Sequence, residues 1–278
     1  MTIQLKSVDS PGFQRQPVRT QILAKAGFAA PDEHAELASR LAAFKNLDKP
    51  VSARLVDALI AGDDDDALAS LRAQAIAEHG SVERLNGFVE KAVAHRLASI
   101  VRADAAATYE AVQERFNTAA AALTVAAGLV DPTTSAHDIL ALNDLKVQKA
   151  WQAAATHSAE LDALLVPLVG AAMNAGVAHP AASDSVAGSR SPKSKSLAFG
   201  LTVDASGCED YRAPWNAWDS DNNAWAALLA AGATIHAKDL DAYEPARIPS
   251  RLVDVKTLRA DGTYVYITTD PDLEAVEG

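Results

Sequence analysis

The sequence feature that most constrains the fold is a long series of helically spaced apolar residues between positions 81 and 173, interrupted once by Asp131-Pro132. Before the interruption these residues recur at steps of three, four and seven, close to the heptad repeat of helices that pack along one another. Because proline disfavours helical geometry at the residue before it, the sequence predicts two helices joined by a loop at 129–135. A short loop between long helices makes them antiparallel neighbours.

The seam between these two helices is predicted to consist of aliphatic and aromatic side chains at helical spacing. Those expected to contribute to the contact surface are Val112, Phe116, Leu123, Leu161, Leu164 and Leu168. Ser135 is placed to cap the second helix, with Asp138 at its positive end. Pro167 inside that helix predicts a kink or a break. His157 falls on the apolar stripe, and we expect a seam histidine satisfied by a neighbour.

An extended arm is predicted at the beginning of the chain, over residues 1–20. Ile3 and Leu5 alternate with polar residues, and Pro17 interrupts regular structure. Such an arm is either mobile or docked along a neighbouring subunit.

Residues 31–80 are predicted to form a base of three short helices, the last of which ends at Gly80. Four consecutive aspartates at 63–66 are the most conspicuous charge run in the chain. Oxygen ligands suit calcium or magnesium, so this run could gather a divalent cation. We favour the alternative, in which Asp63 caps a helix whose first turn is acidic, because carboxylates stabilise the positive end of a helix.

A change of composition at residues 176–196 predicts a flexible linker. The segment is rich in alanine, serine, glycine and proline, and the helical periodicity ends there. Arg190, Lys193 and Lys195 form a local basic cluster in an otherwise acidic chain. The cluster could contact an acidic partner, although a solvated connector is the favoured interpretation.

The last part of the chain, residues 197–278, is predicted to be a small α+β module. Alternating apolar residues over 197–203 have strand spacing, and 222–232 has the pattern of a short helix. Residues 252–258 and 263–269 are rich in β-forming residues and are separated by an Asp-Gly turn, which predicts a β-hairpin.

Three tryptophans, Trp215, Trp218 and Trp225, lie close together in this module. Tryptophan is frequent in binding hot spots, so the three rings could form an exposed platform for a sugar, a peptide or a protein. In a module of this size they are more often the core, and the core is the favoured interpretation.

No residue spacing matches a catalytic, cofactor-binding or metal-binding motif, and the sequence predicts a protein that is not an enzyme. Residues 219–223 begin like a calcium loop, but Ala224 stands where the loop needs glycine and Ala230 where it needs glutamate. Acids beside Cys208 raise rather than lower a thiol pKa, which argues against a catalytic thiolate. An enzyme would require separate acids to converge in a cleft, the candidates being Asp210, Asp219 and Asp221.

The charge and composition of the chain limit its partners. A net charge of -11 opposes binding to nucleic acid or to anionic membranes. One cysteine excludes an intramolecular disulfide, and the beginning of the chain lacks a basic, apolar export signal. No stretch approaches the ~20 apolar residues of a membrane span. We therefore expect a soluble protein, cytoplasmic or part of a virion, without a cofactor.

The predicted fold class is mainly α. A helical domain over 21–175 contains the long antiparallel, coiled-coil-like hairpin at 81–175, and the α+β module at 197–278 follows. This arrangement predicts a non-enzymatic assembly protein that forms a homo-oligomer or binds protein partners. In broad layout it is similar to helical proteins that help build bacteriophage particles, and the Ala-, Asp- and Arg-rich usage suits a high-G+C bacterial host or its virus. The alternative is a binding module whose tryptophan-rich unit captures a protein or carbohydrate ligand.

Overall fold

The computed structural model of the chain is mainly helical, as predicted, with small two-stranded sheets in its C-terminal part. It describes residues 15–45, 50–177, 193–210, 212–219, 224–246, 249–250, 252–259 and 263–274. The chain forms two compact units. We call Ala30–Asp104 the helical rod, and Met1–Ala29 together with Ala105–Gly278 the core unit.

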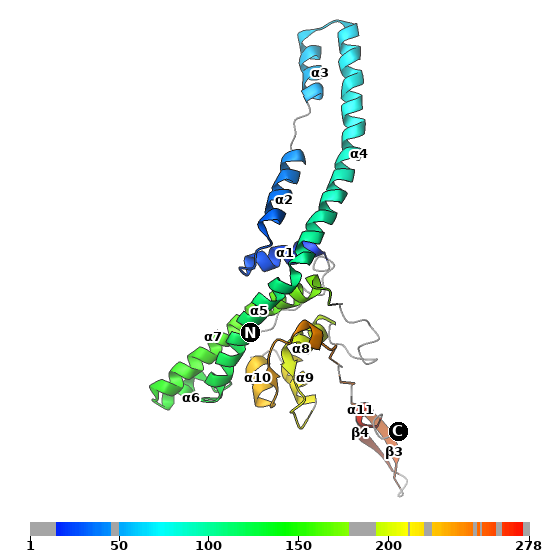
Figure 1. Cartoon of the computed structure of the whole chain (residues 1–278). Coiled ribbons are helices and arrows are strands. Elements are labelled where there is room, and N and C mark those ends of the chain that lie inside the picture. Colours follow the sequence, from blue (N-terminus) through cyan, green and yellow to red (C-terminus); the bar gives the residue numbers. More distant parts are fainter. Residues whose placement is uncertain are drawn as a thin grey trace. The chain divides into compact units, whose positions relative to one another are not determined.

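The helical rod is a long antiparallel hairpin of helices. Helices α2 (Asp32–Lys45) and α3 (Pro50–Ala61) pack in succession along α4 (Asp65–Ala103), as Figure 1 shows. The chain reverses at Gly62, whose φ of 77° lies in the left-handed region that glycine adopts without strain. Asp64 then caps α4 by accepting a hydrogen bond from the amide of Ala67 at 2.8 Å.

Two details of the rod correct the sequence interpretation. The capping aspartate is Asp64 rather than Asp63, and Asp65 and Asp66 occupy the acidic first turn. Helix α4 continues through Gly80 instead of ending there. A single glycine lowers helix stability by only ~1 kcal/mol relative to alanine, so neighbouring turns carry the helix across it.

The core unit is built on a second, shorter hairpin. Helix α5 (Ala105–Ala127) packs along α7 (Leu145–Asn174), and the short helix α6 (Ala136–Ala141) lies in the connection. Ser135 caps α6 as predicted, with its Oγ accepting from the amide of Asp138 at 3.2 Å. Asn143 has a φ of 48° and separates α6 from α7.

The predicted single hairpin at 81–175 is therefore two hairpins. The first predicted arm is divided at Asp104 into α4 and α5, which belong to different units. Its apolar spacing continues across Asp104, so periodicity alone does not reveal that the packing partner changes there. The second predicted arm is divided at Asn143, whereas α7 continues through Pro167 to Asn174 without the predicted break.

The predicted N-terminal arm includes a helix. Helix α1 (Gln16–Lys25) packs on α7, and Pro17 falls in its first turn, where a missing amide hydrogen is tolerated. Arg19 is buried, and its Nε donates to Oδ1 of Asn174 at 2.7 Å. The predicted strand at Ile3 and Leu5 lies outside the described residues.

In its described residues, the C-terminal part of the core unit adds four α-helices, one 3-10 helix and four short strands to the α5–α7 hairpin. Its elements in order are α8 (Lys193–Thr202), β1 (Val203–Asp204), α9 (Arg212–Asp219), α10 (Ala224–Ala230), β2 (Thr234–Ile235), the 3-10 helix η3 (Leu240–Ala242), β3 (Val253–Leu258), β4 (Tyr264–Thr269) and α11 (Pro271–Glu274). β1 pairs with β2 and β3 with β4, both antiparallel.

The strand predicted at 197–203 is the helix α8, apart from Val203, which begins β1. Leu197, Ala198, Phe199 and Leu201 are all buried, and a helix that is apolar on every side has no helical periodicity to detect. The predicted linker is correspondingly shorter, because its last residues begin α8; residues 178–192 lie outside the described part. The predicted hairpin is confirmed with the register Val255 opposite Ile267.

Residues 193–246 do not form a separate module. Side chains from α8, α9, α10 and β2 belong to the same hydrophobic core as those of α5 and α7. Among the described residues, no helix combines the length and the apolar character needed to cross a membrane.

Candidate interaction surfaces

The three clustered tryptophans lie inside the core unit. Trp215, Trp218 and Trp225 are 8%, 2% and 1% exposed. Phe199 of α8 stacks on Trp215 with ring centroids 4.1 Å apart, and Trp218 meets Trp225 edge to face at 5.3 Å. Phe116 of α5 also meets Trp225 edge to face, which joins the tryptophans to the hairpin. The core interpretation is confirmed, because all three rings are buried and offer no exposed platform.

The predicted seam residues are also buried within the core unit. Five of them have an exposed fraction of 0% and Leu164 of 2%; the five are Val112, Phe116, Leu123, Leu161 and Leu168. They share a single cluster with the tryptophans, Leu165 and Leu201. All six therefore contact the chain itself in this fold, where they hold α5 against α7.

A row of polar side chains on α5 holds the extended segment at 237–239. Asn117 accepts from the amide of Ala237 at 2.7 Å and donates to its carbonyl oxygen at 3.2 Å. One turn earlier, Gln113 donates to the same carbonyl at 3.0 Å. One turn before that, Tyr109 donates its hydroxyl to the carbonyl of Lys238 at 2.5 Å. This i, i+4, i+8 row satisfies backbone groups of the irregular segment after β2 with side chains, which is a structural role.

Asp162 of α7 is a partly buried carboxylate at the contact with Trp225. Burial raises its pKa, and the hydrogen bond from Nε1 of Trp225, 2.8 Å long, opposes that rise. Burial also raises the pKa of the Cys208 thiol, with Asp204 and Asp210 adding to the effect. A raised pKa disfavours the thiolate, as predicted, so this cysteine has no catalytic activation.

Within the core unit, an ion-pair cluster links α9 to the residues that flank the β3–β4 hairpin. Arg212 of α9 donates to both carboxylate oxygens of Asp270 and to the carbonyl oxygen of Ser250. Asp272 accepts from the amide and the hydroxyl of Ser250, each at 2.7 Å. Beyond this cluster the hairpin is largely exposed, and Tyr266 is 67% exposed.

The helical rod has very little core of its own. Its described buried apolar residues are Ala58, Ala75, Ile100 and Val101, and α2 has no buried residue. Large apolar side chains point to solvent instead. Their exposed fractions are 54% for Val56, 66% for Leu59, 79% for Ile60, 62% for Ile76 and 73% for Phe88. Val56, Leu59 and Ile60 share one side of α3 because they are three and four residues apart.

No metal centre emerges from the described residues. No group of three His, Cys, Asp or Glu side chains within them is placed to hold a metal ion, and residues 63–66 act as the cap and first turn of α4. The calcium-like sequence at 220–223 lies outside the described part. Asp210 accepts from the amide of Arg212, so its carboxylate caps α9.

The core unit also contains a histidine on the seam side of α7 and an open hollow beside α5. Nδ1 of His157 lies 3.9 Å from Oε2 of Glu160, beyond hydrogen-bond distance, so its expected neighbour is present only as a loose contact. An open hollow of about 510 Å³ lies beside α5, lined in part by Glu110, Gln113 and Asp239. The carboxamide of Gln113 donates to Asp239, and no nucleophile with an adjacent base lines the hollow.

Sequence reasoning missed the rod as an exposed apolar surface with little core behind it. Its signals were present: Gly62 followed by a capping aspartate marks a helical turn, and Val56, Leu59 and Ile60 continue an apolar stripe wider than one neighbour can cover. Comparison of the chain with protein-family models, with curated proteins and with solved structures finds no match.

Proposed function

We propose that this chain is a non-enzymatic assembly protein that associates with further copies of itself through the helical rod. The observation that carries the proposal is the small core among the described residues of 30–104. A helix normally buries its apolar stripe against other elements, and the rod leaves large side chains such as Leu59 and Ile60 more than half exposed.

The core unit supports the same proposal because its central apolar side chains are buried, unlike those of the rod. Its tryptophans and the leucines between α5 and α7 are buried in an internal core, so these residues are not available to a partner. Exposed apolar patches rimmed by charges are typical of protein–protein contact sites. A role as a component of a bacteriophage particle fits this division into a core unit and a contact rod, and it is part of the proposal.

The test is the molar mass of the full chain, measured by light scattering over a range of concentrations. We expect a multiple of the 29.1 kDa monomer that dissociates on dilution. Leu59→Lys should shift the chain to the monomer, because burying an unpaired ammonium is unfavourable. Ala61→Lys is the matched control: it adds the same charge to the end of the same helix, outside the apolar side.

The outcomes separate clearly. A mass equal to the monomer at every concentration contradicts self-association. Equal effects of the two lysine substitutions would show that charge, rather than the exposed apolar side of α3, controls association. Circular dichroism of both variants checks that each remains folded.

A further inference from the structure

We infer that two copies of the rod pair in antiparallel orientation, so that the acidic turn of each lies beside the α2 end of the other. This inference rests on the proposed self-association and adds the surface, the partner and the orientation. Three properties of residues 30–104 lead to it: the area of the rod's long side, the few helices that cover its apolar side chains, and the distribution of charge along it.

The long side of the rod, formed by α4 together with α2 and α3, is large enough for a stable dimer interface. Helix α4 has 39 residues, which at ~1.5 Å per residue gives a length of about 58 Å. With α2 and α3 beside it, the rod is two helices wide, or about 20 Å. Full overlap of two rods therefore covers about 1,200 Å² on each, above the ~800 Å² per partner of a standard interface.

A second copy also supplies the missing layer. One rod is a pair of helices with few buried residues, and two such pairs packed together form a four-helix arrangement in which apolar sides face each other. Two-fold symmetry presents the same patch from both copies, so no other protein is needed to match the surface.

Charge along the rod decides the orientation. We call residues 50–78 the turn half and residues 30–45 with 86–104 the open half. The turn half has six carboxylates, four of them at 63–66, and two arginines, a net charge of -4. The open half has five carboxylates and five Lys or Arg residues, a net charge of zero.

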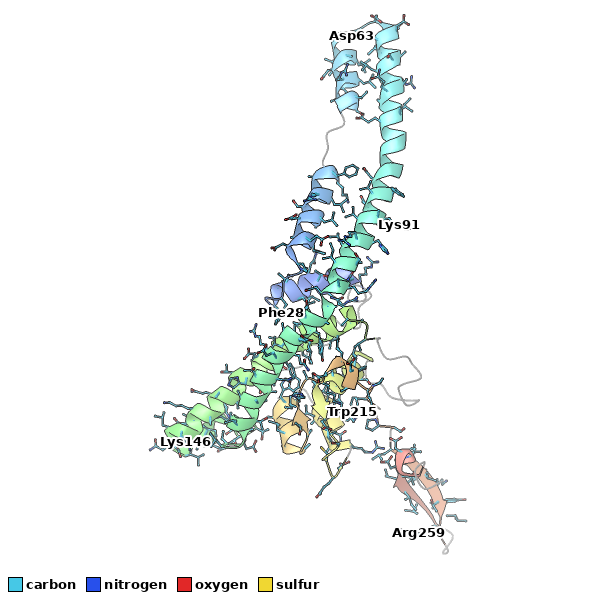
Figure 2. The ribbon with its side chains drawn as sticks, in the orientation of Figure 1. Phe28, Asp63, Lys91, Lys146, Trp215 and Arg259 are labelled. Atoms are coloured by element: carbon cyan, nitrogen blue, oxygen red, sulfur yellow. The ribbon has the colours of Figure 1, made fainter. Side chains whose placement is uncertain are left out.

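The open half also has cations available for a partner. Within it, Arg96 pairs with Glu33 at 2.6 Å and Lys45 with Glu90 at 3.0 Å. Lys91 and Arg102 have no carboxylate partner among the described residues. Figure 2 labels Asp63 at the turn and Lys91 in the part of α4 beside α2. Parallel pairing would place two turn halves of -4 side by side, whereas antiparallel pairing places each beside a neutral half that contains these cations.

The direct test is a distance between spin labels at the two turns. The label is attached to Asp63→Cys in a full chain that also has Cys208→Ser, because Cys208 is the only native cysteine. Antiparallel pairing predicts a tip-to-tip distance of ~60 Å, close to the length of the rod, while parallel pairing predicts less than ~30 Å. A short distance, or no defined distance in an associated sample, overturns the inference and leaves self-association standing.

A second test neutralises the acidic turn. Asp63→Asn, Asp65→Asn and Asp66→Asn together keep the Asp64 cap and should weaken association about threefold to tenfold. Neutralising Glu110, Glu114 and Asp241 in the core unit is the control, because it removes the same net charge from exposed positions elsewhere. Tighter association of the turn variant relative to this control indicates repulsion between turns and overturns the antiparallel arrangement. A chain that is monomeric in both tests contradicts the proposed function itself.

Discussion

The core unit and the helical rod use the same alanine-rich helices but bury their apolar side chains to different extents. In the core unit α5 and α7 are covered by α1, α8 and α10, and Phe116, Leu123 and Leu165 are fully buried. In the rod α4 packs on α2 and α3, and Phe88 is 73% exposed. The difference shows that helical spacing defines an apolar side, whereas the number of layers around it decides whether that side becomes a core or a contact surface.

Two phenylalanines test this comparison with the largest expected effect. Phe116→Ala in the core unit should lower the free energy of unfolding by about 3–5 kcal/mol, because it removes a fully buried ring and leaves a cavity. Phe88→Ala in the rod should change it by about 0.5 kcal/mol or less in the monomer. Urea unfolding, followed by circular dichroism at low protein concentration, measures both. Equal losses would mean that the rod has a core of its own.

A glycine in α8 tests how closely the core unit is packed. A Cβ at Gly200 would lie 2.9 Å from the carbonyl oxygen of Glu244, because the segment after η3 crosses α8 there. Gly200→Ala should therefore destabilise the chain by about 1–3 kcal/mol. At Gly207 a Cβ meets nothing within 4 Å, so Gly207→Ala is the control. Thermal unfolding monitored by tryptophan fluorescence reports this unit, since all four tryptophans belong to it. Similar melting temperatures for the two variants would refute the close approach.

The pH dependence of Asp162 is the smallest expected effect. Burial raises the pKa of Asp162 in the folded chain above its ordinary value, so the protonated carboxyl favours the folded state. This contribution to the free energy of unfolding is fully present below the ordinary pKa and is lost as the pH rises through the folded pKa. Asp162→Asn keeps an acceptor for Trp225 and removes this loss. The variant should be more stable than the parent at about pH 7, with the difference shrinking toward about pH 4. A difference that is constant with pH would show that burial does not shift this carboxyl.

Local signals in the sequence predicted much of the fold. The Ser135 cap, the short helices near Pro31 and Gly62, and the β3–β4 hairpin follow from turn and capping chemistry within a few residues, and the structure contains them. The buried tryptophans follow from their size in a small unit.

The remaining differences depend on tertiary packing. The apolar stripe crosses Asp104 without interruption, so sequence alone does not show that α4 and α5 pack in different units. Leu197 and Leu201 look like strand residues because α8 is buried on every side. The exposure of the rod also depends on packing, because helical spacing identifies its apolar side chains but does not show which of them a neighbouring element covers.

The central claim is that the rod is incomplete alone and is completed by a second copy. Amide hydrogen exchange of the full chain, measured below and above the concentration at which it associates, tests this claim most directly. We expect amides of α3 and α4 to exchange quickly in the monomer and slowly in the associated form, while those of α5 and α7 exchange slowly in both. Rod amides that are as protected as those of α5 and α7 in the monomer would contradict the account.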